Sequence, residues 1–313
     1  MTYSSGGTIE ASDYNGFAGG TAANVSGQLN TVLSTGRGNA GYGQTAVSNV
    51  TAVTNDVTAT QWTTLINGVD KVRKHQSGAG YSNLTAYTSG QVINVTNNIS
   101  AALTTAYTSR LTATAQGSTG TGATNSPNFT LVNGLAGATF QFSRTATFAS
   151  GDAARFFFNA GGQLNFVIIS VTNTGATTRG ASLATLAATN FASKKIGALD
   201  CVARTGTGGT LNTDGTTNTG YYSLTTSNVA KTTITSTTAT YTADTFNLYA
   251  KSNGVQGSNA DVGSVVTLSV DLTSATQTGG FNDSINITVN HRVDIIYPSS
   301  TFLANTWGAV TIA

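Results

Sequence analysis

The sequence predicts an α+β protein in which an N-terminal extended arm and helical region precede a mainly antiparallel, sandwich-like β region with one or two short helices. A change in hydrophobic period supports this prediction. Residues 21–117 repeat apolar side chains every three or four positions, which is typical of amphipathic helices. Residues 129–313 instead alternate apolar and polar side chains, as half-buried strands do. Between them, residues 118–128 are rich in Gly, Ser and Thr and contain Pro127, so we interpret them as a linker.

Residues 1–20 differ from the segment that follows because they are rich in Gly and Ser and carry isolated aromatic side chains. These aromatic residues are Tyr3, Tyr14 and Phe17. Such a composition favours an extended arm that becomes ordered on the surface of a partner. We therefore expect residues 1–20 to contact another subunit.

Three amphipathic helices are predicted in the helical region. A short one precedes Gly36, which is a typical stop signal. A second begins after Thr58 or Thr60, either of which can act as an N-cap. A third extends from Gly90 to Leu111 and needs a partner helix, because its Thr and Asn content makes it weak alone. The apolar positions that define the first two helices are Val25, Leu29, Val32 and Leu33, and then Trp62, Leu65, Ile66, Val69 and Val72.

In the β region, the strongest predicted strand is Gln163–Thr172. Both of its faces are apolar, so we expect it to be buried on both sides. A helix is predicted between Ser182 and Ser193. Residues 205–240 are rich in Thr, with a predicted hairpin turn at Asp214-Gly215, and they could divide the β domain in two. The remaining predicted strands are Thr245–Ala250, Val262–Leu272, which alternates cleanly between an apolar and a polar face, and Ile285–Ile296.

The scarcity of charge predicts self-association. Only 8% of the residues are charged, against roughly 25% in an ordinary soluble domain, and Glu10 is the single glutamate. Weakly charged surfaces repel their neighbours little, and polar strands without charges lack the usual protection of sheet edges. In an assembly such edges can pair between subunits. We therefore expect a homo-oligomer, either a dimer or a trimer.

The sequence offers little for chemistry. The net charge is +2 without a long basic run, and the longest dense apolar stretch is far short of a membrane span, so neither nucleic acid nor membrane is an expected partner. Cys201 is the only cysteine, and no paired carboxylates stand out. His291 and Asp294 fall on opposite faces of a regular strand, and His75 closes a helix, where a cation is favourable. We therefore predict no catalytic, cofactor-binding or metal-ligating residues, and no enzyme activity.

A Gly-rich segment matches the G-x-G-x-x-G pattern of dinucleotide-binding proteins. It covers residues 36–41. The nucleotide-binding interpretation requires a strand before the pattern and a helix opening at it. A predicted helix precedes it here instead, so a connecting loop with a shaped contact surface is the better interpretation.

Three stretches resemble a known family. Residues 36–44 read Gly-Arg-Gly-Asn-Ala-Gly-Tyr-Gly-Gln and are followed by Val-Thr-Ala-Thr-Gln-Trp at 57–62. Residues 151–162 read Gly-Asp-Ala-Ala-Arg-Phe-Phe-Phe-Asn-Ala-Gly-Gly, and residues 248–257 read Leu-Tyr-Ala-Lys-Ser-Asn-Gly-Val-Gln-Gly. These stretches resemble uncharacterised virion structural proteins of marine tailed bacteriophages. The resemblance implies a place in the tail, neck, baseplate or fibre, contacts with other virion proteins, and assembly in the host cytoplasm. It carries no catalytic residue.

The second of these stretches also has a physical interpretation. Asp152 is predicted to cap a short helix that ends at Gly161 or Gly162. Three consecutive phenylalanines cannot all face one way, so at least one fills either a neighbouring layer of the same core or a neighbouring subunit. The residues predicted to make contacts between subunits are Tyr3, Tyr14, Phe17, Arg37, Tyr42, Trp62, Arg155, Phe156, Phe157, Phe158, Tyr221 and Tyr222.

A second function stays open at this point. The chain could instead be a receptor-binding fibre tip or a capsid decoration protein that contacts host surface glycans. Exposed aromatic residues in a shallow groove would support it, for example around Tyr221, Tyr222 and Tyr241.

Overall fold

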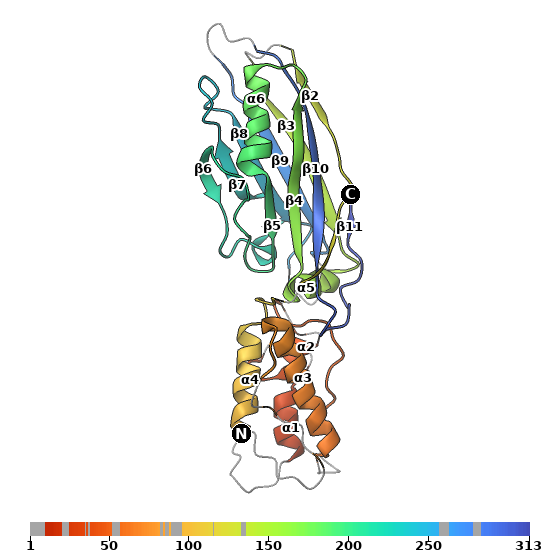
Figure 1. Ribbon diagram of the computed structural model, residues 1–313. Coiled ribbons are helices and arrows are strands. Elements are labelled where there is room, and N and C mark those ends of the chain that lie inside the picture. Colours follow the sequence, from red (N-terminus) through yellow and green to blue (C-terminus); the bar gives the residue numbers. More distant parts are fainter. Residues whose placement is uncertain are drawn as a thin grey trace.

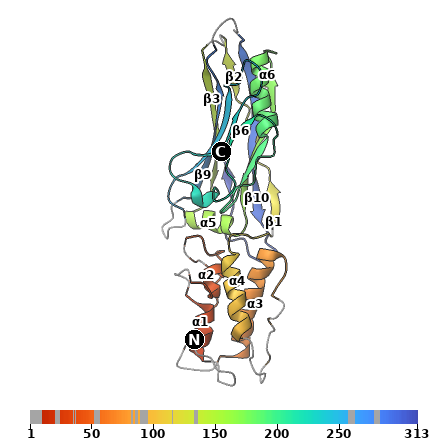
Figure 2. The same ribbon diagram turned by 90° about the vertical axis from the view of Figure 1, so that its left-hand side faces the viewer.

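The structure is a computed structural model with two parts stacked end to end. A bundle of helices occupies one end of an elongated molecule, and a β-sandwich occupies the rest, with helices and strands both running near the long axis (Figure 1, Figure 2). No helix in the described part is both long and apolar enough to cross a membrane. The structure describes residues 10–20, 25–34, 36, 38–51, 57–81, 84, 88, 96–114, 116–132, 136–256, 263–277 and 283–313.

The bundle contains the three predicted helices, although the first begins only at Leu29 and leaves Val25 exposed, and residues 90–95 of the third lie outside the described residues. Thr58 caps the longest of them, because its hydroxyl accepts the N–H of Gln61 while the Gln61 side chain accepts the N–H of Thr58. Gly78 ends the same helix in the left-handed conformation. The predicted stripe on this helix is buried in full, which confirms the periodicity argument. The helices are α1 (Ala11–Ala18), α2 (Leu29–Leu33), α3 (Ala59–Ser77) and α4 (Thr96–Thr108).

The extended-arm prediction is wrong for residues 11–18, which form α1. Glu10 and Asp13 make a capping box at the start of this helix. Tyr14 and Phe17 lie one turn apart and are buried against Trp62, with ring centroids 6.3 and 6.1 Å from it. Burying two aromatic side chains in the core stabilises the chain more than leaving them in an arm exposed to water. Tyr3 lies outside the described residues.

The sandwich consists of two antiparallel sheets, which confirms the predicted α+β fold class. One sheet has the order β1-β10-β4-β5, with β2 also pairing with β10. The other has the order β11-β3-β9-β8-β7-β6. The strands of the first sheet are β1 (Gln116–Gly120), β2 (Asn128–Leu131), β4 (Gln163–Asn173), β5 (Ser193–Ile196) and β10 (Ile285–Pro298). The strands of the second are β3 (Ala138–Thr147), β6 (Thr210–Asp214), β7 (Val229–Thr235), β8 (Thr245–Ser252), β9 (Val265–Ser274) and β11 (Thr311–Ile312).

Helices close the sandwich at its side and at one end. The predicted helix at 182–193 begins earlier, as α6 (Thr178–Ala184), and continues as the π-helix η1 (Thr185–Phe191). Phe191 stacks on Phe246 of one sheet and meets Phe166 of the other, so this helix joins the two layers. At the end nearest the bundle lie α5 (Gly151–Asn159) and the 3-10 turn η2 (Tyr221–Ser223) (Figure 1).

The linker prediction at 118–128 is also wrong. Residues 116–120 form β1, and Asn125 exchanges backbone hydrogen bonds with His291 of β10. The small residues that suggested a linker allow two chains to approach closely. A side chain at Gly122 would put its Cβ 2.1 Å from the carbonyl oxygen of Val293. Low side-chain volume here reflects packing rather than a domain boundary.

Residues 205–240 belong to the second sheet and do not divide the domain. Asp214-Gly215 is not the predicted tight turn, because residues 215–228 separate β6 from β7 and carry η2 to the base of the sandwich.

The strand β4 is buried on one face only, not on both faces as predicted. Its inner side chains are buried, but Ile169 on the outer face is 43% exposed. The predicted alternation of β9 is confirmed, with every second side chain buried.

Candidate assembly surfaces and the joint between the two parts

The edge of β3 is partly unpaired. β11 covers only its last residues, where Thr145 and Ala313 exchange N–H to oxygen bonds of 2.9 Å. In antiparallel sheets the backbone groups of successive residues point to opposite edges. Thr139, Gln141 and Ser143 have the same parity as Thr145, so their N–H and C=O groups point away from β9. None of the described residues pairs with these groups.

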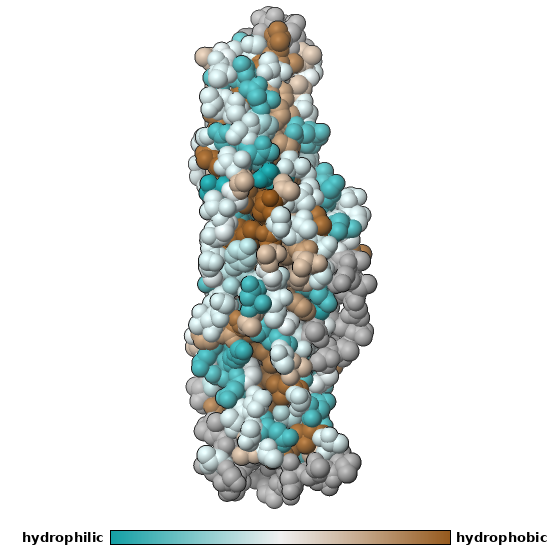
Figure 3. All heavy atoms as spheres, turned by 90° about the vertical axis from the view of Figure 1, so that its right-hand side faces the viewer, coloured by the Kyte–Doolittle hydropathy of each residue, from teal (hydrophilic) through white to brown (hydrophobic). Residues whose placement is uncertain are grey.

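Residues 138–143 of this edge carry no charged side chain, and the charges beside them are Arg144, which follows on β3, and Asp271 on the sheet face. The side chains of Thr139, Gln141 and Ser143 are exposed, and Gln141 donates to the carboxylate of Asp271 on the sheet face (2.9 Å). Beside the edge, β2 leads into Val132, which is 83% exposed. Figure 3 shows the side on which β2 and β11 lie, where white and brown surface predominates and hydrophilic groups are scattered. Such an edge lacks the charges that normally prevent strand pairing.

A hydrogen-bonded clamp joins the sandwich to the bundle. Arg155 of α5 donates to the carbonyl oxygens of Ala40 (2.7 Å) and Gly36 (3.4 Å), and Asn159 donates to that of Gly41 (3.0 Å). Asp152 pairs with the Arg155 guanidinium at 2.5 Å. The Gly-rich segment singled out in the sequence is therefore the loop on which α5 docks.

The N-cap of α5 lies two residues before the predicted one. The hydroxyl of Ser150, not Asp152, accepts the N–H of Ala153. Ser150 is the residue with extended backbone, which an N-cap needs, whereas Asp152 already lies in the first turn. This shift frees Asp152 to hold Arg155.

Further contacts hold the bundle and the sandwich together at this joint, the contact region between α5 and residues 36–44. Tyr222 donates to Asn159 Oδ1 (2.7 Å), and His75 of α3 contacts the carbonyl oxygen of Ala160 (2.8 Å). His75 was expected to be a cation at a helix end, but burial lowers its pKa and favours the neutral ring. Gly43, at a φ of +70°, lies so close to the Phe156 ring that a Cβ would be 2.5 Å from it. The C-terminal segment adds Ala304, whose backbone is held by the Gln44 amide.

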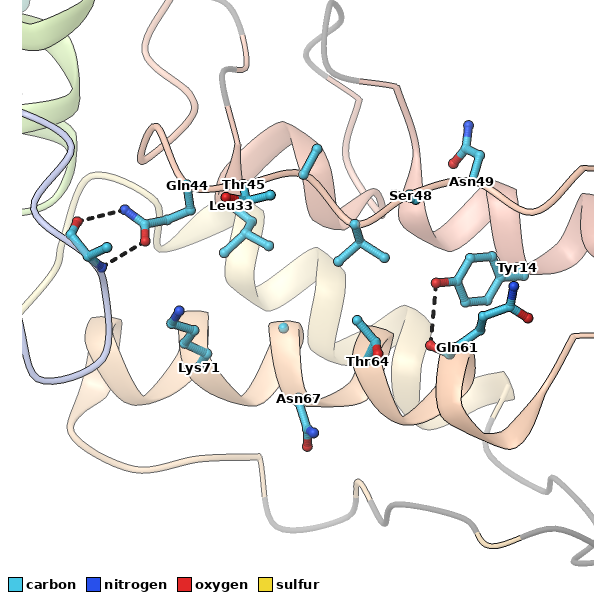
Figure 4. Close-up of a pocket in the computed structure, with 14 residues that line it drawn as sticks. Tyr14, Leu33, Gln44, Thr45, Ser48, Asn49, Gln61, Thr64, Asn67 and Lys71 are labelled. Atoms are coloured by element: carbon cyan, nitrogen blue, oxygen red, sulfur yellow. Dashed lines mark hydrogen bonds between the residues drawn. The ribbon is translucent and has the colours of Figure 1, made fainter.

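A groove of about 580 Å³ opens in the bundle between α3 and the extended segment 44–49 (Figure 4). Gln61, Thr64 and Lys71 line it from α3, and Tyr14 donates to the carbonyl oxygen of Gln61 at its far end (3.3 Å). The lining offers amide and hydroxyl groups with Lys71 as its charged residue. None of its described lining residues carries a carboxylate or an imidazole.

The residues predicted to contact other subunits are gathered in the core and in the joint instead. Tyr42, for example, donates to the carbonyl oxygen of Arg110 and receives a hydrogen bond from Gln76. The aromatic residues expected to line a glycan groove do not form one, because Tyr221 and Tyr241 are buried and the Tyr222 hydroxyl is bonded inside the joint. Arg37 lies outside the described residues. The buried members are Tyr14, Phe17, Tyr42, Trp62, Arg155, Phe156, Phe157, Phe158 and Tyr221.

The chain has no significant match among protein-family models, curated proteins or solved structures. The resemblance to virion proteins of tailed phages therefore stays a prediction. Within the described residues, no three His, Cys, Asp or Glu side chains gather as a metal site would require. His291 packs between Phe142 and Phe166, and burial lowers its pKa, while Asp294 pairs with Arg292.

The unpaired edge was missed as a specific site by sequence reasoning. Its only local signal is the absence of a charged residue between Ala138 and Ser143. The same absence occurs in many other parts of this chain, so it could not single out β3. The unpaired edge is recognised only in the structure, where β11 pairs with just the last residues of β3.

Proposed function

We propose that the chain is a non-enzymatic structural subunit of a tailed-bacteriophage particle, an adaptor, collar or fibre component of the tail, neck or baseplate. It assembles in the host cytoplasm with copies of itself and with other virion proteins, and it needs no cofactor. The observation that carries the proposal is the uncharged, unpaired edge of β3. This edge supports strand addition from a neighbouring subunit.

The partner at this edge is a second copy of the chain. A two-fold axis through Gln141 would place Gln141 opposite Gln141 of the second copy, and Thr139 opposite Ser143. Each of these pairs can exchange two backbone hydrogen bonds, worth about 1 kcal/mol each. No charged side chain projects from the pairing segment, so no like charges oppose each other there. Val132, exposed at the end of β2, adds apolar surface near the edge, because Phe129 of the same strand packs against Phe140 and Phe142 of β3.

Substituting proline at Gln141 tests this edge. The N–H of Gln141 points away from β9, so its loss removes no hydrogen bond within the chain but blocks the central pair between copies. We expect size-exclusion chromatography with light scattering to find an oligomer for the natural chain and a monomer for Gln141→Pro. The control variant Gln141→Thr keeps the N–H and should remain oligomeric. A monomeric natural chain, or an unchanged Gln141→Pro oligomer with a native circular dichroism spectrum, would contradict the proposed edge.

The proposed location in the virion is tested by a separate experiment. Proteomic mass spectrometry of purified phage particles from the host should detect the chain in a fixed ratio to other tail proteins. Its absence from intact particles, with recovery only in the soluble lysate, would contradict a virion role even if the chain is oligomeric.

A further inference from the structure

A lysine and an aspartate from different sheets meet inside the sandwich. Lys194 belongs to β5 of one sheet and Asp214 to β6 of the other (Figure 1). The Lys194 side chain is completely buried, and that of Asp214 is 12% exposed. Lys194 Nζ lies 2.5 Å from Asp214 Oδ1 and also donates to the carbonyl oxygen of Val202 (3.2 Å). A buried ion pair of this kind bridges the two layers of the sandwich.

The carboxyl group is fixed in position. The backbone N–H of Arg204 donates to Oδ2 (3.1 Å), and the hydroxyl of Thr232 donates to Oδ1 (3.1 Å). A C–O bond is about 1.23 Å long, so the carboxyl carbon can lie no further than about 3.7 Å from Lys194 Nζ. That is near the separation of reacting atoms in a near-attack arrangement.

Buried positive charges outnumber negative ones around this pair in the described part of the chain. Lys231 is also fully buried, and its ammonium donates to the carbonyl oxygen of Thr219 and the hydroxyl of Ser223. Burial lowers the pKa of Lys231, Cys201 opposes part of that fall, and the neighbouring Lys194 charge lowers the pKa further. Among their described contacts, the two ammonium groups have one carboxylate, Asp214. Losing the charge of Lys194 together with that of Asp214 would remove a desolvation cost and a repulsion.

We propose that Lys194 and Asp214 condense into an amide that links the two sheets covalently. The bond between Nζ and the carboxyl carbon forms as the bond from that carbon to Oδ1 breaks. Two protons of the ammonium leave with Oδ1 as one water molecule, and one proton stays on the amide nitrogen. The neutral pair needed for attack arises by moving one ammonium proton across the 2.5 Å contact. The reaction consumes no oxidant, reductant or cofactor, and it does not depend on the proposed virion role.

Intact-mass spectrometry of the full chain, denatured before measurement, tests the link. The mass of the natural chain should be lower than that of its sequence by one water molecule, and Lys194→Arg should have the full mass. Asp214→Asn should condense by losing ammonia, so its product should equal the natural product in mass. Proteolysis should then yield a branched peptide that joins β5 to β6.

Asp214 precedes Gly215, and an Asp-Gly sequence can lose water by another route, as a succinimide within the backbone. That product would persist in Lys194→Arg, would be opened by hydroxylamine and would give no branched peptide. Either this pattern or a full mass for the folded natural chain after prolonged incubation overturns the proposal. The natural chain decides the question even if the variants fold poorly.

Discussion

Replacing Arg155 with methionine is expected to uncouple the helical bundle from the sandwich and to lower the free energy of unfolding by about 2–4 kcal/mol. The guanidinium is buried and holds the carbonyl oxygens of Gly36 and Ala40 together with the carboxylate of Asp152. Methionine fills similar space but leaves those carbonyl groups without a donor. Calorimetry should resolve two transitions in the variant where the natural chain gives one.

A matched control comes from the bundle itself. Lys74 forms a partly exposed pair with Asp70, so Lys74→Met removes a cation without leaving a buried group unpaired. We expect a change of less than about 1 kcal/mol and a single transition. If Arg155→Met behaves like Lys74→Met, the clamp does not couple the two parts.

Asp244→Asn is expected to stabilise the chain at neutral and alkaline pH. Burial raises the pKa of Asp244 to about 6 from its ordinary value of 3.8, and the Arg179 charge opposes part of that rise. The folded chain thus binds this proton more tightly than the unfolded chain, and stability falls as the pH rises from about 4 to about 6. Asparagine can still accept the N–H of Ala275, which now binds Asp244 Oδ1. The gain should approach about 3 kcal/mol above pH 7.

Urea unfolding at pH 4 and pH 8 measures this effect. The gain from Asp244→Asn should be small at pH 4, where the natural side chain is protonated in the fold, and large at pH 8. Asp271→Asn, the same substitution at a half-buried position on β9, provides the control for replacing an aspartate by asparagine. Equal gains for Asp244→Asn at both pH values would rule out ionisation as the cause.

Local patterns predicted the elements that bury a regular stripe. The side chains of α3 from Trp62 to Val72 and the alternation of β9 follow directly from residue spacing. Composition gave wrong predictions, an arm and a linker, where Gly, Ser and Thr belong to helices and strands. The helix α1 is short and contains few apolar residues, yet Tyr14 and Phe17 are buried together with Ala11 and Ala18.

The sites depend on distant contacts, which spacing cannot predict. Lys194 and Lys195 are adjacent and chemically identical, but the strand turns the first inward and the second outward. Only the approach of β6 gives Lys194 its partner. Likewise, Arg155 finds its acceptors more than a hundred residues earlier in the chain.

The alignment of the strands has a mechanical consequence. β4 and β10 pair from Gln163–Ile296 to Asn173–Ile287, nearly parallel to the long axis of the molecule (Figure 1). Pulling the two ends apart along that axis would shear this whole row of hydrogen bonds at once instead of opening them one by one. The sandwich is therefore built to resist stretching, and the helical end should yield to force first.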